Sequence, residues 1–246
     1  MTPAQRSFAR KITGQAAARP RADGGRSASA VVLTPAVDTA AAQVAMRLQH
    51  DLRRLKEIQS IERKIDAKRE MLPEYAPWVK GLLAADNASV GDLSSEVLPT
   101  MMVWCIDTGD FDDALVLAEF VLRHDVPLPH RYQRAAPALI AEEIANAALK
   151  AQLADQPFDL GVLQRVEELT ADADMHDEIR AKLFKAIGFE MAREMDAMGE
   201  QPEPLMHAAA LAALEPLKRA QALHERCGVK DRIKRLEKIV AASAAT

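Results

Sequence analysis

The stretch MMVWCIDTGDFDDALVLAEFVL, residues Met101–Leu122, decides the fold, because two apolar helical patterns meet there at a three-residue break. Gly109 stands in the break, where a residue in the left-handed conformation can end a helix without a Cβ penalty. Asp110 can then cap the second helix, whose first turn carries two more aspartates at the positive end of its dipole. The stretch therefore predicts a helical hairpin on which the core is built.

The composition favours an all-α protein of one large or two small domains. Hydrophobic residues make up 49% of the 246 residues and charged residues 28%, while only 4% are aromatic. Alanine and leucine dominate the apolar content, and alternating β-branched runs are missing, which favours helices. No stretch approaches the ~18 apolar residues of a membrane span, and no signal peptide begins the chain, so a cytosolic protein is expected. Cys105 and Cys227, far apart in helical patterns, are expected to be reduced thiols.

Residues 1–36 show no helical or strand periodicity and are predicted to form a disordered basic arm. Residues 1–30 contain six Lys or Arg and one acidic residue, Asp23, so their net charge is +5. Because the whole chain has a net charge of −4, the remaining residues have a net charge of −9. Such an arm suits a polyanion, because cations that neutralise phosphates release condensed counterions; a solvated terminus without a partner fits the composition equally well. The candidate phosphate contacts are Arg6, Arg10, Lys11, Arg19, Arg21 and Arg26.

Residues 37–71 are predicted to form one long helix, because apolar residues from Val44 to Ile65 recur at intervals of three and four without Gly or Pro. Its apolar stripe needs a partner, which could be the rest of the chain, a second subunit in a coiled coil, or both. From Arg47 to Glu70 there are eight Lys or Arg against five Asp or Glu. These charges fit a solvated face, and DNA contact is the alternative. The candidate contacts on this helix are Arg47, Arg53 and Arg54.

Residues 72–198 are predicted to be a core of packed helical hairpins, loosely like tetratricopeptide units but without a fixed repeat period. Pro73 and Pro77 are expected to frame a short helix, and Asp159 to cap a later one. The segment GEQPEP, Gly199–Pro204, is the clearest linker, so residues 199–246 are predicted to be a linker followed by a C-terminal helical hairpin.

No catalytic motif is visible, and the catalytic residues stay unknown. The chain has no phosphate-binding glycine loop, no zinc-type Cys and His spacing and no nucleophile elbow, so no metal site and no cofactor are assigned. The best remaining acidic and histidine grouping is a possible Mg²⁺-dependent nuclease centre. It consists of His124, Asp125, His130, Glu142 and Glu143.

Read together, several long segments resemble the small terminase subunits, often named terminase endonuclease subunits, of temperate contractile-tailed phages and related prophages. The similarity runs nearly end to end. The segments that carry it are MTPAQR at Met1–Arg6, LPEYAPWVKGLL at Leu72–Leu83, MMVWCIDTGDFDDALVLAEFVLRHDVPLP at Met101–Pro129, AEEIANAAL at Ala141–Leu149, LTADADMHDEIRAKLFKAIG at Leu169–Gly188 and RAQALHERCGVKDRIKRLEK at Arg219–Lys238.

The resemblance implies a role in packaging double-stranded viral DNA into a preformed capsid, in the cytoplasm of a bacterial host. A small subunit is expected to recognise the cohesive-end site and to partner a large ATPase subunit, which is the more natural home of the nuclease centre. Small terminases generally assemble as ring-like homo-oligomers, which would give the stripe of the long helix a partner.

Three functions fit these sequence features. The preferred one is a DNA-recognition and assembly subunit that is not itself catalytic. In the second, this subunit cuts DNA with Mg²⁺ held by an acidic cluster that includes Glu142 and Glu143. The third is a helical scaffold that binds only the large subunit, which predicts tight protein binding without measurable DNA affinity.

Overall fold

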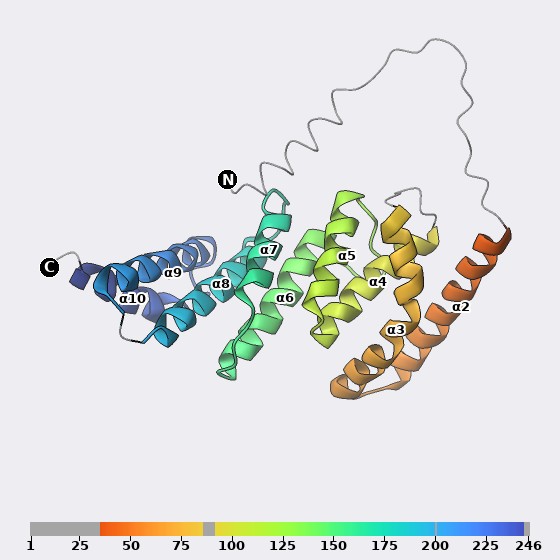
Figure 1. Cartoon of the computed structure of the whole chain (residues 1–246), viewed down its shortest axis with the longest axis horizontal. Coiled ribbons are helices and arrows are strands. Elements are labelled where there is room, and N and C mark those ends of the chain that lie inside the picture. The colour runs from red at the N-terminus through yellow and green to blue at the C-terminus, as the bar shows by residue number, and fades with distance from the viewer. Residues whose placement is uncertain (1–34, 86–91, 200, 244–246) are drawn as a thin grey trace, which may run out of the picture.

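The computed structural model describes residues 35–85, 92–199 and 201–243, and every element in these ranges is an α-helix (Figure 1). The predicted all-α class is confirmed. Among the described helices, none has both the length and the hydropathy needed to cross a bilayer. The elements are α2 (Pro35–Glu57), α3 (Ile61–Ala85), α4 (Asp92–Thr108), α5 (Phe111–Arg123), α6 (Ala136–Leu153), α7 (Leu160–Thr170), α8 (Asp177–Ala197), α9 (Glu203–Leu223) and α10 (Lys230–Ser243).

Consecutive helices pair as hairpins, and the hairpins stand side by side in chain order along the long axis of the molecule (Figure 1). Helices α2 and α3 lie at one end and α9 and α10 at the other. The rings of Phe111 and Phe158, 4.9 Å apart, join the start of α5 to the segment before α7. This row of hairpins agrees with the predicted bundle, and its likeness to tetratricopeptide units is loose.

The hairpin around Gly109 forms as predicted between α4 and α5. Gly109 has a φ of 81°, and its N–H donates to the carbonyl of Ile106 while the N–H of Asp110 donates to that of Cys105. These two bonds are the Schellman pattern, which satisfies carbonyls at the end of α4. Asp110 does occupy the N-cap of α5, but its side chain makes no capping hydrogen bond. The expected cap is wrong in that detail.

The single helix predicted over residues 37–71 is wrong. The chain leaves helical geometry at residues 58–60, and α3 runs back antiparallel to α2. Ser60 begins the new helix, because its hydroxyl accepts from the N–H of Arg63 at 3.3 Å and its carbonyl from that of Lys64. The apolar stripe therefore finds much of its partner within its own chain.

Pro73 and Pro77 lie inside α3 and do not frame a separate short helix. Both prolines are exposed and stand four residues apart, so they share the outer face, while Met71 and Tyr75 are buried on the inner one. A proline on the outer face leaves only solvent-side carbonyls without helical donors, and water can satisfy them. The helix therefore continues through both positions.

Two groups of buried side chains form the core. The larger runs from α2 to α8 and includes the edge-to-face pair of Tyr75 and Trp104, whose centroids lie 5.9 Å apart. The smaller joins the end of α8 to α9 and α10 around Met195, Leu217 and Leu236. Helix α8 contributes to both groups and links them. Cys105 and Cys227 are free thiols, as predicted.

Candidate nucleic-acid interface

Six of the nine predicted DNA contacts lie outside the described residues. They are Arg6, Arg10, Lys11, Arg19, Arg21 and Arg26, all within the N-terminal arm. The other three, Arg47, Arg53 and Arg54, project from α2 and are exposed. The candidate contacts that the structure describes therefore lie on the hairpin of α2 and α3.

Two of these arginines are engaged by carboxylates across the hairpin. Arg47 pairs with Glu74, and Arg54 donates to Glu70 at 3.0 Å. Partner numbers fall along α3 as they rise along α2, which is the pattern of an antiparallel pair. All four side chains are between 47% and 66% exposed, so each pair contributes at most about 1 kcal/mol and does not prevent exchange for a phosphate.

A buried hydrogen bond fixes the hairpin beneath these ion pairs. The hydroxyl of Tyr75 donates to the carboxylate of Asp51 at 2.7 Å, and both residues are buried. Burial, together with that hydrogen bond and the charge of Asp51, raises the pKa of Tyr75, so the tyrosine stays a neutral donor. The contact holds α2 and α3 at a set separation and leaves a groove of about 280 Å³ between them, which includes His50 and Met71 in its lining.

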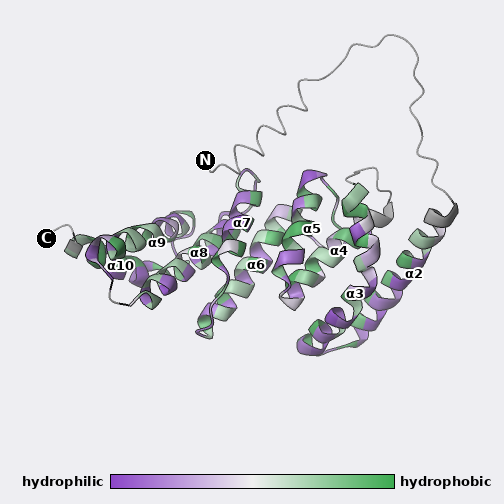
Figure 2. Ribbon diagram, in the orientation of Figure 1, coloured by the Kyte–Doolittle hydropathy of each residue, from purple (hydrophilic) through white to green (hydrophobic). Residues whose placement is uncertain are grey.

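The end of this hairpin carries four cations that have no carboxylate partner among the described residues. They are Arg53 and Lys56 in the last turns of α2 and Arg63 and Lys64 in the first turns of α3. We call these four the hairpin tip. Figure 2 shows the joined ends of α2 and α3 as strongly hydrophilic.

Sequence reasoning named Arg53 and missed the other three members of the hairpin tip. In a continuous helix, Lys56 and Lys64 would lie about 12 Å apart along the axis, with acidic and basic side chains between them. The reversal at residues 58–60 brings the end of α2 and the start of α3 together. The sequence did contain one signal for a helix start here, because Ser60 is a residue that commonly caps helices. The signal is incomplete, since a full capping box would have Glu or Gln three residues later and this chain has Arg63. Glu57 and Glu62 also lie at this end and reduce its positive charge.

The alternative acidic and histidine centre does not form a metal-binding group. Glu142 is buried between two cations, with Oε1 at 2.8 Å from Lys182 and Oε2 at 2.8 Å from Arg134. The ring of His124 lies against Phe120 at 4.3 Å. Within the described residues, no three His, Cys, Asp or Glu side chains are grouped as a metal ion requires.

Glu143, the second carboxylate of that centre, is half-buried beside other carboxylates. Burial, followed by the charges of Asp107 and Glu142, raises its pKa. A carboxyl group whose pKa is raised is a proton carrier in some active sites, but among the described residues no group of three His, Cys, Asp or Glu side chains could hold a metal ion beside it. Glu142 and Glu143 are therefore interpreted as structural residues that help to pack α6 against its neighbours.

The chain is similar to a known protein family and to two known proteins. A family model described as phage small terminase subunit matches residues 45–178, from α2 into the start of α8. The chain is 39% identical over 196 residues to a protein named terminase, endonuclease subunit, of Escherichia phage P2, covering 80% of this chain and 72% of that protein. It is 27% identical over 210 residues to the probable terminase, endonuclease subunit of Haemophilus phage HP1, covering 83% and 71%. No solved structure matches the chain.

Proposed function

This chain belongs to the phage small terminase subunit family, and on that premise we propose that it recognises the cohesive-end site of double-stranded viral DNA and works with a large ATPase and nuclease subunit. The complex would cut and package the DNA in the cytoplasm of the host bacterium. In this role the chain is the recognition and assembly subunit.

The observation that carries DNA recognition is the hairpin tip. Arg53, Lys56, Arg63 and Lys64 are exposed or partly exposed on two helices that a buried contact fixes together. Cations held on rigid helices can contact phosphates with little ordering of the protein. Each phosphate neutralised releases a condensed counterion, so binding should weaken steeply with salt. The basic N-terminal arm would add sequence-independent attraction.

The test measures the affinity of the full chain for a cohesive-end duplex and for a shuffled duplex between 50 and 300 mM KCl. Changing Arg53, Lys56, Arg63 and Lys64 together to Gln should reduce the slope of log K against log salt by about 3 to 4, since each contact contributes about 0.9. Deleting residues 1–30 should reduce it further.

A matched control is Lys150→Gln, which removes an exposed lysine of α6 that has no carboxylate partner among the described residues. This change should leave both affinity and slope unaltered. Equal slopes for the wild-type chain and the four-fold variant would contradict DNA contact at the hairpin tip. Equal affinity for the two duplexes would contradict recognition of the cohesive-end site by this subunit alone.

We also propose that the subunit is a homo-oligomer and that it binds the large subunit. Met46 on α2 and Ile61 at the start of α3 are 63% and 76% exposed, and a subunit contact at the hairpin of α2 and α3 would bury both side chains. Light scattering of the purified chain gives the mass of the assembly. A monomer at micromolar concentration would contradict the homo-oligomer.

The names of the two relatives favour a second candidate, in which this subunit itself cleaves DNA with Mg²⁺. Incubating the purified chain with cohesive-end DNA and Mg²⁺, without the large subunit, tests it directly. Nicking that is lost in Glu143→Gln, with helix content unchanged by circular dichroism, would support this candidate. Intact DNA under these conditions would contradict it.

A further inference from the structure

We propose that the outer face of α10 is a second surface for the phosphate backbone of double-stranded nucleic acid, separate from the hairpin tip. The proposal extends the proposed DNA recognition to the opposite end of the molecule. Helix α10 lies beyond residues 45–178, which the family model matches.

The surface follows from the amphipathic pattern of α10. Val229, Ile233 and Leu236 are buried in the smaller core group and face α8 and α9. Lysines at positions 230, 234 and 238 recur every four residues on the other side, and all three are exposed. Four residues of helix rise about 6 Å, so the lysines form a row along one side of α10. Arg226 is exposed in the turn between α9 and α10, four residues before Lys230, and adds a cation near the start of α10.

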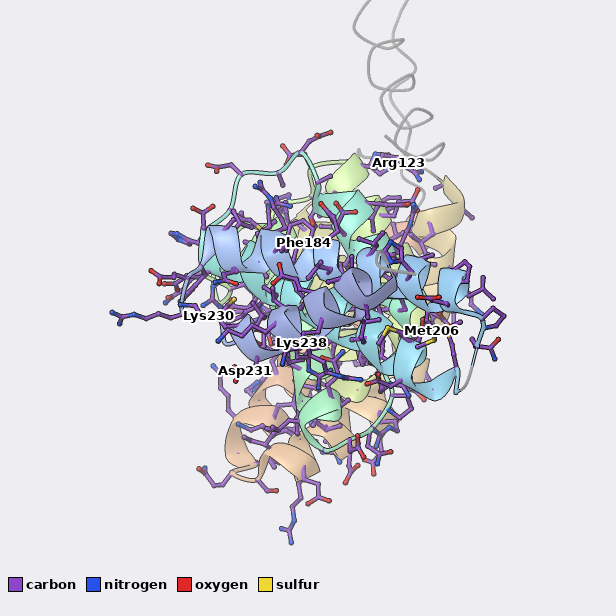
Figure 3. All side chains as sticks on the ribbon, turned by 90° about the vertical axis from the view of Figure 1, so that its left-hand side faces the viewer. Arg123, Phe184, Met206, Lys230, Asp231 and Lys238 are labelled. Atoms are coloured by element: carbon purple, nitrogen blue, oxygen red, sulfur yellow. The ribbon has the colours of Figure 1, made fainter. Side chains whose placement is uncertain are left out.

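We call Arg226, Lys230, Lys234 and Lys238 the α10 cation row. Figure 3 looks onto the end of the molecule formed by α9 and α10, and it labels Lys230, Asp231 and Lys238 along α10. Asp231 is exposed within this face and subtracts one charge from the row.

Most of the row is free to bind an anion. Lys230 lies 3.2 Å from Glu225, an exposed pair that a phosphate can replace. Within the described part of the chain, no carboxylate pairs with Arg226, Lys234 or Lys238.

The other cations of α10 hold the helix in place. The guanidinium of Arg232 lies 4.3 Å from the ring centre of Phe189, and Arg235 pairs with Asp196, so both join α10 to α8. Glu237 accepts from Lys218 of α9 at 2.8 Å. Because these contacts fix α10 on two neighbours, the outward lysines are presented by a rigid element.

The distribution of charge along the chain favours a polyanion at this end. Residues 203–243, which include α9 and α10, hold eight Lys or Arg against five Asp or Glu, whereas residues 71–202 hold 10 against 24. The middle of the molecule therefore repels a polyanion, and the two ends attract it. In Figure 1 the hairpin of α2 and α3 and the hairpin of α9 and α10 lie at opposite ends of the long axis.

The chemistry of the face favours nucleic acid over a protein partner. Protein interfaces have apolar or aromatic centres and are depleted in lysine. No residue of α10 is among the exposed large hydrophobic side chains of the described chain, and lysine supplies three of the four members of the row. Repeated, mobile point charges suit the repeated phosphates of a duplex. The acidic middle of a second copy is the competing occupant, and the experiment separates the two.

The test uses the full chain carrying Arg226→Gln, Lys234→Gln and Lys238→Gln together, and a 30-base-pair duplex of mixed sequence. Fluorescence anisotropy at several KCl concentrations gives Kd and its salt slope, and sedimentation without DNA gives the mass. We expect the slope to fall by about 2 to 3 and Kd to rise by roughly 10-fold at 100 mM KCl. The mass should stay the same.

Lys80→Gln with Lys150→Gln is the matched control, because it removes two exposed lysines from the acidic middle. This control should bind as the wild type does, and an equal loss in it would overturn the proposal. A row variant with unchanged Kd and slope, beside hairpin-tip variants that bind weakly, would overturn the second surface and leave the proposed function standing. An altered mass with an unchanged slope would also overturn it, in favour of contact with a second copy. Loss of slope in both sets of variants, additive when combined, supports two surfaces.

Discussion

Tyr75 and Asp51 show how one buried contact determines the spacing of two helices. The phenolic hydroxyl donates at 2.7 Å to a carboxylate on a residue that is only 8% exposed. Tyr75→Phe would remove the hydroxyl donor and leave the largely desolvated carboxylate of Asp51 with one hydrogen bond fewer. Hydrogen bonds to charged groups contribute about 1.5–3 kcal/mol, so the free energy of unfolding should fall by about that amount. Urea unfolding followed by circular dichroism measures it.

Tyr132→Phe is the control for loss of a phenolic hydroxyl. Tyr132 is only partly buried, and the guanidinium of Arg131 lies 5.1 Å from the centre of its ring. A hydroxyl without a buried carboxylate partner should cost less than about 1 kcal/mol when removed. Equal losses in the two variants would show that the Asp51 carboxylate is satisfied by other means.

Glu167 makes the fold sensitive to pH. Burial, followed by the charges of Glu168 and Glu215, raises its pKa. A carboxyl group with a raised pKa destabilises the fold in its charged form, so the penalty is present above the folded pKa and absent below the ordinary value near ~4.3. Glu167→Gln should therefore raise the free energy of unfolding at pH 7 by a few tenths to about 1 kcal/mol. Urea unfolding from pH 7 to pH 3.5 should show the gain disappearing.

Glu119→Gln should change stability in the opposite direction. Burial raises the pKa of Glu119, but hydrogen bonds from Arg165 and Arg123 outweigh it and leave the pKa lowered. A lowered pKa contributes stability above the unfolded value that is lost as pH falls through the folded one. The variant should be less stable than wild type at pH 7 and approach it in acid. Changes of the same sign in both variants would refute this account.

At the scale of elements, the crossing of α8 and α9 depends on the absence of a side chain at position 188. A Cβ there would lie 2.5 Å from Cγ of Leu217, which is fully buried, and 3.2 Å from the backbone carbonyl oxygen of Ala213. Leu217 could move only by pushing α9 away, because the carbonyl oxygen blocks the other side. Gly188→Ala should therefore lower the free energy of unfolding by about 1–3 kcal/mol, measured by thermal and urea unfolding.

Gly81→Ala is its matched control, since Gly81 lies within α3 and a Cβ there would have nothing within 4 Å. Alanine favours a helix over glycine by about 1 kcal/mol, so this variant should be more stable than wild type. If Gly188→Ala were equally stabilising, close packing of α8 on α9 would not be what places glycine there.

The hairpin at Gly109 and the break at Ser60 show what local sequence could and could not predict. Gly109 has a left-handed φ of 81°, which glycine adopts readily, so the glycine in the sequence predicted this turn. Ser60 lies in a run that keeps its apolar period across the break. The spacing of apolar residues alone cannot distinguish one continuous helix from two antiparallel helices, because both arrangements bury the same apolar side chains. The reversal is decided by contacts far apart in sequence, such as Asp51 with Tyr75.

For the whole molecule, the same limit applies to the candidate interface. The charges in the sequence predicted a basic arm and a helix with both acidic and basic side chains. On that helix they indicated Arg47, Arg53 and Arg54 as candidate DNA contacts. The fold pairs two of these with Glu74 and Glu70, and it gathers cations from both sides of the turn at residues 58–60. Which cations remain available depends on tertiary ion pairs, which no local pattern contains. The arm stays a prediction.

The acidic middle of the molecule should make stability rise with salt. Residues 71–202 carry 10 Lys or Arg against 24 Asp or Glu, and folding brings these carboxylates closer than they are in the unfolded chain. Exposed ion pairs such as Arg54 with Glu70 act in the opposite sense, because salt weakens them, but each contributes only about 0–1 kcal/mol. The screening length falls from about 20 Å to 6 Å between 20 and 300 mM NaCl, so repulsion across the body is removed first.

We therefore expect the thermal midpoint to rise by about 2–4 °C over this range, which corresponds to roughly 1 kcal/mol for a chain of this size. Asp172→Asn combined with Asp174→Asn removes two exposed charges between α7 and α8. It should raise the midpoint in 20 mM NaCl and reduce the further gain on adding salt, because fewer like charges remain to be screened. A midpoint that falls with salt in the wild-type chain would mean that its ion pairs outweigh the repulsion of its carboxylates.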